Sequence, residues 1–342
     1  MTPVPNVSAP IKLHLSEKPP FPPTMSRESP IRVDLYEPKY EACWDQFIRQ
    51  SKNGVFIFQR NYLEYHADRF NDFSLLFFQD GQLVALMPAN RVDDIVMSHG
   101  GLTFGGIISD HRMTTILMLE VFSALVNELR RQGVKELIYK AIPHIYHTLP
   151  AEEDLYALFL HNAKLFRRDV SSTVVNGGKI PLARGRRHAL NRGKSCRLEV
   201  ARTQEFCRFM AIAEANLQAR FGVRTVHSVA EIELLASRFP ENIKLFTAQR
   251  MGVMLGGYII YESRNVAHAQ YVGVTEEARS LGVLDCIIDV LLNEVYADKP
   301  YFDFGISTVE NGHTLNTGLI QNKESYGARA TVYDFYELTL DT

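Results

Sequence analysis

The chain has 342 residues, a formal net charge of −2, 46% hydrophobic residues and 22% charged residues. This composition is typical of a soluble globular protein with room for two domains, and it excludes the global basic charge that attracts DNA. The four cysteines are scattered without metal-ligand spacing, and no apolar run reaches the roughly 18 residues that span a bilayer, so we expect a cytoplasmic protein with neither a metal nor a transmembrane segment.

Residues 1–30 hold eight of the fifteen prolines in the chain. Such a segment cannot build a helix or a central strand, so we expect a flexible, extended arm that is dispensable for folding. The run "PPFPP" leaves a polyproline docking peptide open as the alternative.

Residues 72–142 predict a hairpin, a strand, a glycine-rich loop, a helix and a closing strand, in that order. The hairpin turns at Asp80-Gly81, and the strand "IVMSHGGLTFGGIIS" breaks into the loop. In "DHRMTTILMLEVFSALVNELRRQG" the apolar residues recur at intervals of three and four, and Gly133 lies where a helix stop belongs. "KELIYKAI" is the closing strand.

Residues 242–307 repeat this order. The hairpin turns near Met251-Gly252, "NVAHAQYVGVT" is a strand, "EEARSLG" is a loop, "VLDCIIDVLLNEVYA" is an amphipathic helix and "YFDFGIS" is a strand. The repeat predicts an α/β (α+β) protein of two similar domains, residues 31–170 and residues 171–342, each with a mixed sheet flanked by helices. After the last predicted strand we expect a polar loop of about twenty residues, which at that length is usually functional or disordered. The strand-like run "ATVYDFYEL" that follows favours a functional loop.

The loop before the second predicted helix reads Arg279-Ser280-Leu281-Gly282-Val283-Leu284. Backbone N–H groups at a helix N-terminus, a glycine and an arginine together suit an anion. This loop resembles the R-x-x-G-x-x arrangement with which GNAT-superfamily acetyltransferases hold the pyrophosphate of coenzyme A, except that Leu284 stands where the family has Gly or Ala. The first copy lacks the arginine, so the resemblance implies one acyl-CoA site, in the second domain.

The closing segment "FDFGIST…LNTGLIQNKESYGAR", residues 302–329, resembles a signature of the FemAB-like branch of the same superfamily. "SHGGLTFGG", residues 98–106, is similar to a second block of that group. The group occurs in cell-envelope and polysaccharide biosynthesis, and it implies duplicated GNAT units, in agreement with the repeat. It also implies a protein that is either free in the cytoplasm or peripheral to the inner membrane.

Acyl transfer to an amine needs a neutral amine and stabilisation of an oxyanion. The resemblance implies that the backbone near Val272-Gly273-Val274 supplies oxyanion donors and that Lys323 binds the acceptor or stabilises charge. Ser307 is a candidate proton donor to the leaving thiol, and Asp303 and Glu324 are candidates for proton handling. In the alternative interpretation, Asp303 and Asn316 only fasten loop backbone, and Lys323 with Glu324 forms a solvated ion pair.

Other residues are candidates for binding the acceptor. Tyr326 replaces a phenylalanine of the signature, His99 lies beside two glycines, and Arg69 belongs to "RNYLEYHADRF" with Tyr62. His99 is alternatively structural. The basic segment 183–197 binds phosphate or, alternatively, forms the exposed face of a helix that caps the second domain.

Three functions remain open from the sequence. The first is an acyl-CoA-dependent N-acyltransferase acting on an amino-sugar or amino-acid-like acceptor, a small molecule that is either free or linked to a nucleotide or a lipid. The second is an aminoacyl-tRNA-dependent transferase, and the third is a catalytically silent binding protein. The R-x-x-G loop and the near-neutral charge favour the first, and nothing in the sequence sets the oligomeric state.

Overall fold

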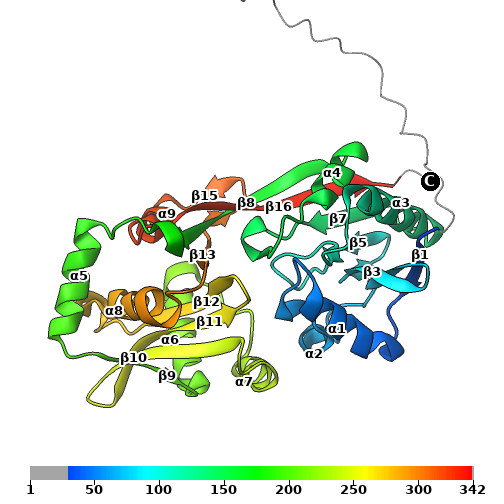
Figure 1. Cartoon of the computed structure of the whole chain (residues 1–342). Coiled ribbons are helices and arrows are strands. Elements are labelled where there is room, and N and C mark those ends of the chain that lie inside the picture. The colour runs from blue at the N-terminus through cyan, green and yellow to red at the C-terminus, as the bar shows by residue number, and fades with distance from the viewer. Residues whose placement is uncertain (1–29, 341–342) are drawn as a thin grey trace, which may run out of the picture.

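A computed structural model describes residues 30–340 of the chain. The predicted arm, residues 1–30, therefore lies almost entirely outside the described residues. The strands form a four-stranded sheet in the order β1-β2-β3-β6, a ten-stranded sheet in the order β4-β5-β7-β16-β8-β13-β12-β11-β10-β9, and the small pair β14-β15. Helices flank both larger sheets (Figure 1), so the mixed α/β fold class is confirmed.

The strands are β1 (Arg32–Leu35), β2 (Leu75–Gln79), β3 (Gln82–Met87), β4 (Asn90–Val92), β5 (Ile95–Met97), β6 (Ile108–Ser109), β7 (Glu136–Lys140), β8 (Lys164–Val175), β9 (Glu199–Thr203), β10 (Ile243–Arg250), β11 (Val253–Glu262), β12 (Val266–Val274), β13 (Tyr301–Ile306), β14 (Thr308–Val309), β15 (Thr314–Leu315) and β16 (Arg329–Thr339). The α-helices are α1 (Glu41–Gln50), α2 (Arg60–Leu63), α3 (Thr115–Arg131), α4 (Glu153–Leu160), α5 (Arg184–Ser195), α6 (Phe206–Phe221), α7 (Val229–Arg238), α8 (Val283–Val290) and α9 (Thr317–Glu324). Short 3-10 turns lie at Pro38–Tyr40, Phe56–Phe58, Glu64–His66, His144–Tyr146, Asn176–Gly178 and Arg279–Leu281, and a π-helical turn continues α8 at Leu291–Val295.

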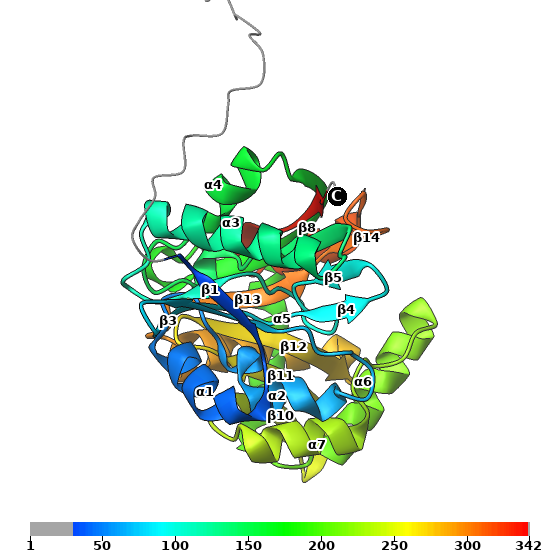
Figure 2. The ribbon, with the colours of Figure 1, turned by 90° about the vertical axis from the view of Figure 1, so that its right-hand side faces the viewer.

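The predicted order of elements is present in the first half. β2 and β3 form the hairpin around Asp80-Gly81, and β5 pairs in parallel with β7 after the crossover through α3. Thr114 caps α3 by accepting the N–H of Leu117. Alternate residues of β2 face opposite cores, with Leu75 and Phe77 in the α3 core and their neighbours in the α1 core. Figure 2 shows α3 and α1 on opposite sides of these strands.

The second half repeats the pattern. β10 and β11 form the hairpin around Met251-Gly252, and β12 pairs in parallel with β13 after the crossover through α8. Each half thus closes on a parallel pair, which is the tandem arrangement that the repeat predicts.

The last strand joins the two halves. β16 lies between β7 and β8, antiparallel to both, so the C-terminal end of the chain completes the sheet of the first half. β8 in turn pairs with β13 of the second half. The proposed division after residue 170 falls inside β8, and it stays a proposal.

The polar segment after β13 is not one long loop, contrary to our expectation. It holds the β14-β15 pair and helix α9, whose N-terminus is capped by Asn316 Oδ1 accepting the N–H of Leu319 at 3.0 Å. The helix was missed because its sequence has no apolar periodicity. Only one side chain of α9, that of Lys323, is buried.

Candidate active site between the two halves

β12 and β13 pair over only three residues and then diverge. Their register ends where His268 lies opposite Asp303. Beyond this point β12 continues to Val274, while β13, which pairs with β8 from Tyr301 onward, shifts its register with β8 between Asp303 and Ile306. His268 Nδ1 lies 2.8 Å from Asp303 Oδ2 at this fork. A histidine–carboxylate pair therefore marks the point of divergence.

Asp303 is fully buried and accepts four hydrogen bonds. Oδ1 accepts from the hydroxyls of Ser171 at 2.5 Å and Thr173 at 3.0 Å, and Oδ2 accepts from His268 and from the Tyr333 hydroxyl at 2.9 Å. Burial acts to raise its pKa, but the hydrogen bonds from His268, Ser171 and Tyr333 outweigh burial and hold the pKa below its usual value. Because the carboxylate is ionised, the proton of the shared bond belongs to His268 Nδ1, and in the neutral form of the imidazole the lone pair lies on Nε2.

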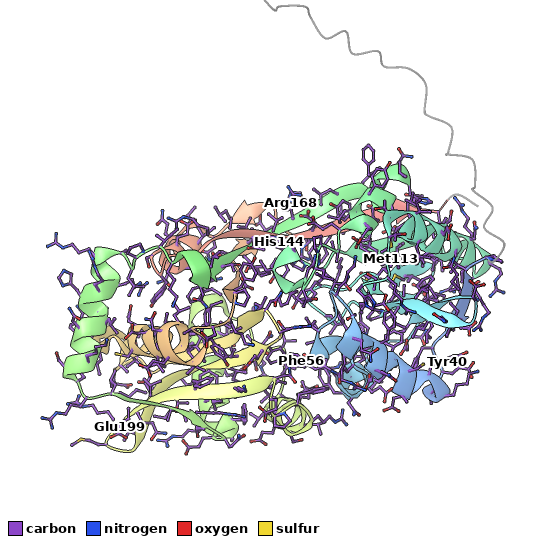
Figure 3. All side chains as sticks on the ribbon, in the orientation of Figure 1. Tyr40, Phe56, Met113, His144, Arg168 and Glu199 are labelled. Carbon is purple, nitrogen blue, oxygen red and sulfur yellow. The ribbon has the colours of Figure 1, made fainter. Side chains whose placement is uncertain are left out.

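His268 lines a cavity of about 250 Å³ between the halves. The first half contributes residues 55–57 and 100–104, and Phe56, labelled in Figure 3, lies where this half meets the strands of the second. The other lining residues are Tyr62, Tyr146, Val226, His227, Tyr261, Ser263 and Gln270. Sites between two structural units are a common place for ligands.

A second route connects Asp303 to the cavity. The Tyr146 hydroxyl lies 3.4 Å from the Tyr333 hydroxyl, which donates to Asp303. Burial raises the pKa of both tyrosines well above the ordinary value, so both remain protonated. The carboxylate thus fixes two groups that face the same cavity, His268 directly and Tyr146 through Tyr333.

Two buried lysines hold the backbone on either side of this region. Lys323 Nζ donates to the carbonyls of Gly305 and Ile306, both at 2.7 Å, and burial lowers its pKa to about 8. Lys140 Nζ donates to the carbonyls of His99 and Leu102, and burial lowers its pKa to about 7. Lys323 therefore fastens the end of β13 and does not form a solvated pair with Glu324.

Ser307 and Asn316 lie beside this fastened end. The Ser307 N–H donates to the Val170 carbonyl at 2.7 Å, and its buried Oγ has no partner within the described residues. Asn316 caps α9, and its own N–H donates to the Ser307 carbonyl at 2.8 Å. These contacts match the interpretation of Asn316 as a fastener of loop backbone.

Tyr326 and Glu324 lie at the other end of α9, away from the cavity lining. Tyr326 is buried, stacks on Phe304, and donates from its hydroxyl to Asp285 at 3.1 Å. Glu324 accepts the N–H of Gly327 through its main-chain carbonyl at 2.9 Å.

The anion loop predicted at residues 279–284 lies against α5. Gly282 has φ +77°, and a Cβ there would lie 2.0 Å from the Ala189 carbonyl oxygen, so the helix covers this glycine closely. Arg279 and Ser280 are exposed. A hollow of about 550 Å³ opens beside them, lined by Ser280, Leu281, His188, Asn191, Arg192, Ser195 and Cys196.

The basic segment 183–197 forms α5 and packs on α8 as the predicted cap. Arg186 lies over the Tyr326 ring at 4.5 Å and 3.4 Å from Asp285, and Lys194 pairs with Asp289 at 2.8 Å. Arg184 and Arg187 remain exposed on the outer side.

Of the three residues proposed as oxyanion donors, Val274 is engaged by α6. Its N–H donates to Asn216 Oδ1 and its carbonyl accepts from Asn216 Nδ2, both at 3.0 Å. The N–H groups of successive residues in a strand point to opposite sides. The Val272 N–H therefore points to the same side as the Val274 N–H, towards the space where β12 and β13 have diverged, and the Gly273 N–H points to β11. Val272 is the remaining candidate of the three.

His99 and Arg69 lie at the junction but not in the cavity lining. His99 is buried with φ +64° and its ring centre lies 5.1 Å from that of His66. Burial lowers the pKa of His99 to about 3. Arg69 crosses between the halves and pairs with Glu231 on α7 at 2.6 Å.

Sequence reasoning named Asp303 but missed its partner. His268 lay in a segment interpreted only as a strand, and nothing along the chain indicates that it stands opposite Asp303. The available signal was a polar side chain inside each of two apolar predicted strands. The register that pairs them depends on the fold.

Among residues 30–340, no group of three or more His, Cys, Asp or Glu side chains is arranged to hold a metal ion, and no helix is long and apolar enough to cross a membrane.

Comparisons with known proteins support the family expectation. Residues 181–312 match the family model described as the acetyltransferase (GNAT) domain. No curated protein sequence matches the chain. Among solved structures, FemX is similar with a TM-score of 0.66 at 9% identity, covering 90% of this chain and 97% of that one.

Two further structures share the fold. L-PGS from Bacillus licheniformis has a TM-score of 0.54 at 12% identity, with 90% and 93% of the two chains covered. The C-terminal domain of a putative lysylphosphatidylglycerol synthetase from Agrobacterium fabrum has a TM-score of 0.52 at 11% identity, with 75% and 81% covered. At these identities the likeness concerns the fold alone.

Proposed function

We propose that this acyltransferase moves an acyl group onto an amine bound in the cavity between the halves. The match of residues 181–312 to the GNAT acetyltransferase domain and the fold similar to that of FemX support the proposal. The observation that carries the proposal is the His268–Asp303 pair, which stands at the fork of β12 and β13 with the imidazole on the cavity wall.

The chemistry follows from the protonation of this pair. The amine nitrogen attacks the acyl carbon, and His268 Nε2 takes the proton that the nitrogen must lose. Asp303 stabilises the imidazolium that forms. The bond from the acyl carbon to sulfur breaks, and the proton returns from His268 to the leaving thiolate. Val272 N–H is our candidate donor to the oxyanion.

Acyl-CoA is the donor that we propose first, since GNAT domains in general use it. The face of Gly282 is covered by α5 and does not fit a pyrophosphate. The residues that suit phosphates are those of the hollow beside it, where Arg192 and Ser280 lie together with Arg192 Nε 3.3 Å from the Ser280 carbonyl oxygen. We propose that Arg279, Ser280 and Arg192 hold the donor there.

An aminoacyl-tRNA donor is the second candidate. The covered face of Gly282 and the exposed Arg184 and Arg187 on α5 favour it. In that case the ester bond to the ribose oxygen breaks in place of the thioester, and the roles of His268 and Asp303 are unchanged.

A transfer assay with both donors tests the proposal. The purified full chain is incubated with acetyl-CoA, with longer acyl-CoA thioesters or with charged tRNA, each against a panel of amino sugars and amino acids, and products are identified by mass spectrometry. We expect an N-acylated product with at least one acyl-CoA. Product from charged tRNA alone would replace the first donor by the second, and no product with any pair would refute the proposed function.

A further inference from the structure

The cavity has no charged side chain in its lining. Its polar groups are hydroxyls, imidazoles, one side-chain amide and backbone, and no Asp, Glu, Lys or Arg is among the lining residues. A carboxylate or phosphate placed inside would lose its water without gaining an opposite charge, which is strongly unfavourable. The portion of a ligand that enters the cavity must therefore be uncharged apart from a reacting amine.

Aromatic rings form much of the wall. Phe56, Tyr62, Phe104, Tyr146 and Tyr261 all line the cavity. They are held by contacts with one another: the centres of Phe56 and Tyr261 lie 5.4 Å apart, and those of Phe104 and Tyr146 lie 4.5 Å apart. Fixed flat apolar surfaces with hydroxyl tips suit a ring that has apolar C–H faces and polar edges.

His227 supplies one fixed polar contact. It is 4% exposed and lines the cavity. Its backbone N–H donates to the Tyr271 hydroxyl at 3.1 Å, and its Nδ1 lies 2.7 Å from the same oxygen. The hydroxyl oxygen accepts from the backbone and can donate its own proton to Nδ1, and in this arrangement the ring proton lies on Nε2. That buried Nε2 has no partner within the described residues.

The imidazole is also neutral. Burial lowers the pKa of His227 to about 4, so at neutral pH it acts as an uncharged N–H donor. A buried donor without a partner is unfavourable, and an oxygen of a ligand in the cavity would satisfy it. The size limits this ligand. The volume of about 250 Å³ lies just below the roughly 300–1,000 Å³ of pockets that hold drug-sized ligands, so the cavity suits a ligand of about one ring.

We propose that the cavity is a subsite for the uncharged hydroxylated ring of an amino sugar, and that His227 Nε2–H donates to a hydroxyl or ring oxygen of that sugar. The inference rests on the proposed function, in which this cavity holds the acceptor, and it decides between the two acceptor classes that the sequence left open. An amino acid would bring its carboxylate into the uncharged cavity. A phosphate or lipid attached to the sugar must lie outside it.

Binding measured without any acyl donor tests this inference. The probes are methyl glucosaminide, glucosamine 6-phosphate and L-serine, which share one amine and differ in added negative charge. Titration calorimetry on the full chain should show methyl glucosaminide binding at least tenfold more tightly than either charged probe. His227→Phe should weaken sugar binding roughly three- to tenfold, as expected for one lost neutral hydrogen bond, whereas His227→Asn, which keeps an N–H donor, should weaken it less.

His111→Phe is the matched control, because His111 is exposed on the loop before α3 and should bind the sugar as the unmodified chain does. The inference is overturned if L-serine binds as tightly as the sugar, if no sugar binding is measured, or if folded His227→Phe binds the sugar normally. Should His227→Phe not fold, His227→Asn and the ranking of the three probes decide. Sugar binding without acyl transfer from any donor would refute the proposed function and leave the sugar subsite in place.

Discussion

Replacing Asp303 by asparagine tests the most specific feature of the site, the protonation state that the carboxylate imposes on His268. The change keeps the shape of the side chain and its Oδ1, which accepts from Ser171 and Thr173. At Oδ2 it puts an NH₂ group opposite His268 Nδ1–H and the Tyr333 hydroxyl. Two donors then face each other, and His268 must move its proton from Nδ1 to Nε2.

The expected magnitudes follow from these four contacts. A hydrogen bond to a charged group contributes about 1.5–3 kcal/mol and a neutral one about 0.5–1.5 kcal/mol. Three of the four contacts persist in neutral form, and the loss of the buried charge offsets part of the difference. We expect the free energy of unfolding to fall by about 1–3 kcal/mol. With Nε2 protonated, the base is lost, and general-base catalysis is worth about 10²–10⁴-fold, so kcat should fall at least about 10²-fold.

Tyr333→Phe is the matched control. It removes one hydrogen bond to the same oxygen of Asp303 but leaves the His268 contact intact, so it should lower stability by about 1.5–3 kcal/mol and reduce kcat far less than Asp303→Asn. Steady-state kinetics and urea unfolding of the two variants supply both quantities. Equal losses of kcat in two equally stable variants would refute the assignment of Asp303 as the residue that sets the His268 proton.

Three other changes have definite outcomes. Lys323→Met leaves the Gly305 and Ile306 carbonyls without their donor, so the free energy of unfolding should fall by about 2–4 kcal/mol. A large loss of turnover with an unchanged melting temperature would instead show that Lys323 acts at the reaction centre. Gly282→Ala places a Cβ 2.0 Å from the Ala189 carbonyl at a φ of +77° and should lower stability by about 2 kcal/mol or more by displacing α5, which a normal melting temperature would contradict. Burial lowers the pKa values of His66, His99 and His227 to about 4, 3 and 4. As the pH falls, these histidines take up protons in the unfolded chain before they do so in the folded chain. The free energy of unfolding should therefore be full above about pH 6.5 and fall by about 1 kcal/mol per histidine by pH 5.5. Flat unfolding free energies between pH 7 and pH 5.5 would show that these rings are charged or exposed in the native protein.

The duplicated order of elements was predictable because it depends on local signals. The Asp80-Gly81 and Met251-Gly252 turns, the apolar spacing of α3 and Gly133 all lie within short windows of sequence. Helix α9 was not predictable in this way, because it is held by the cap at Asn316 and by the contacts of Lys323 and has no apolar stripe of its own. The position of β16 between β7 and β8 is a long-range pairing without a local signal.

The candidate site was predictable only in part. Asp303 was named from the resemblance, and Tyr62, which belongs to the segment named as a candidate for binding the acceptor, lines the cavity. His268 and His227 were missed because their importance depends on pairing with Asp303 and Tyr271, across register and contacts that the sequence does not specify. We expected Gly282 of the R-x-x-G loop to let the backbone approach an anion. In the structure, helix α5 packs against this glycine instead.

The most direct test of the central claim is the rate of acyl transfer catalysed by His268→Gln relative to the unmodified chain, with the best donor and acceptor from the transfer assay. Glutamine fills similar space but cannot accept the amine proton, so at equal folded fraction the account predicts kcat at least about 10²-fold lower with acceptor binding changed only a few-fold. Turnover by folded His268→Gln within a few-fold of the unmodified chain would contradict the assignment of His268 as the base.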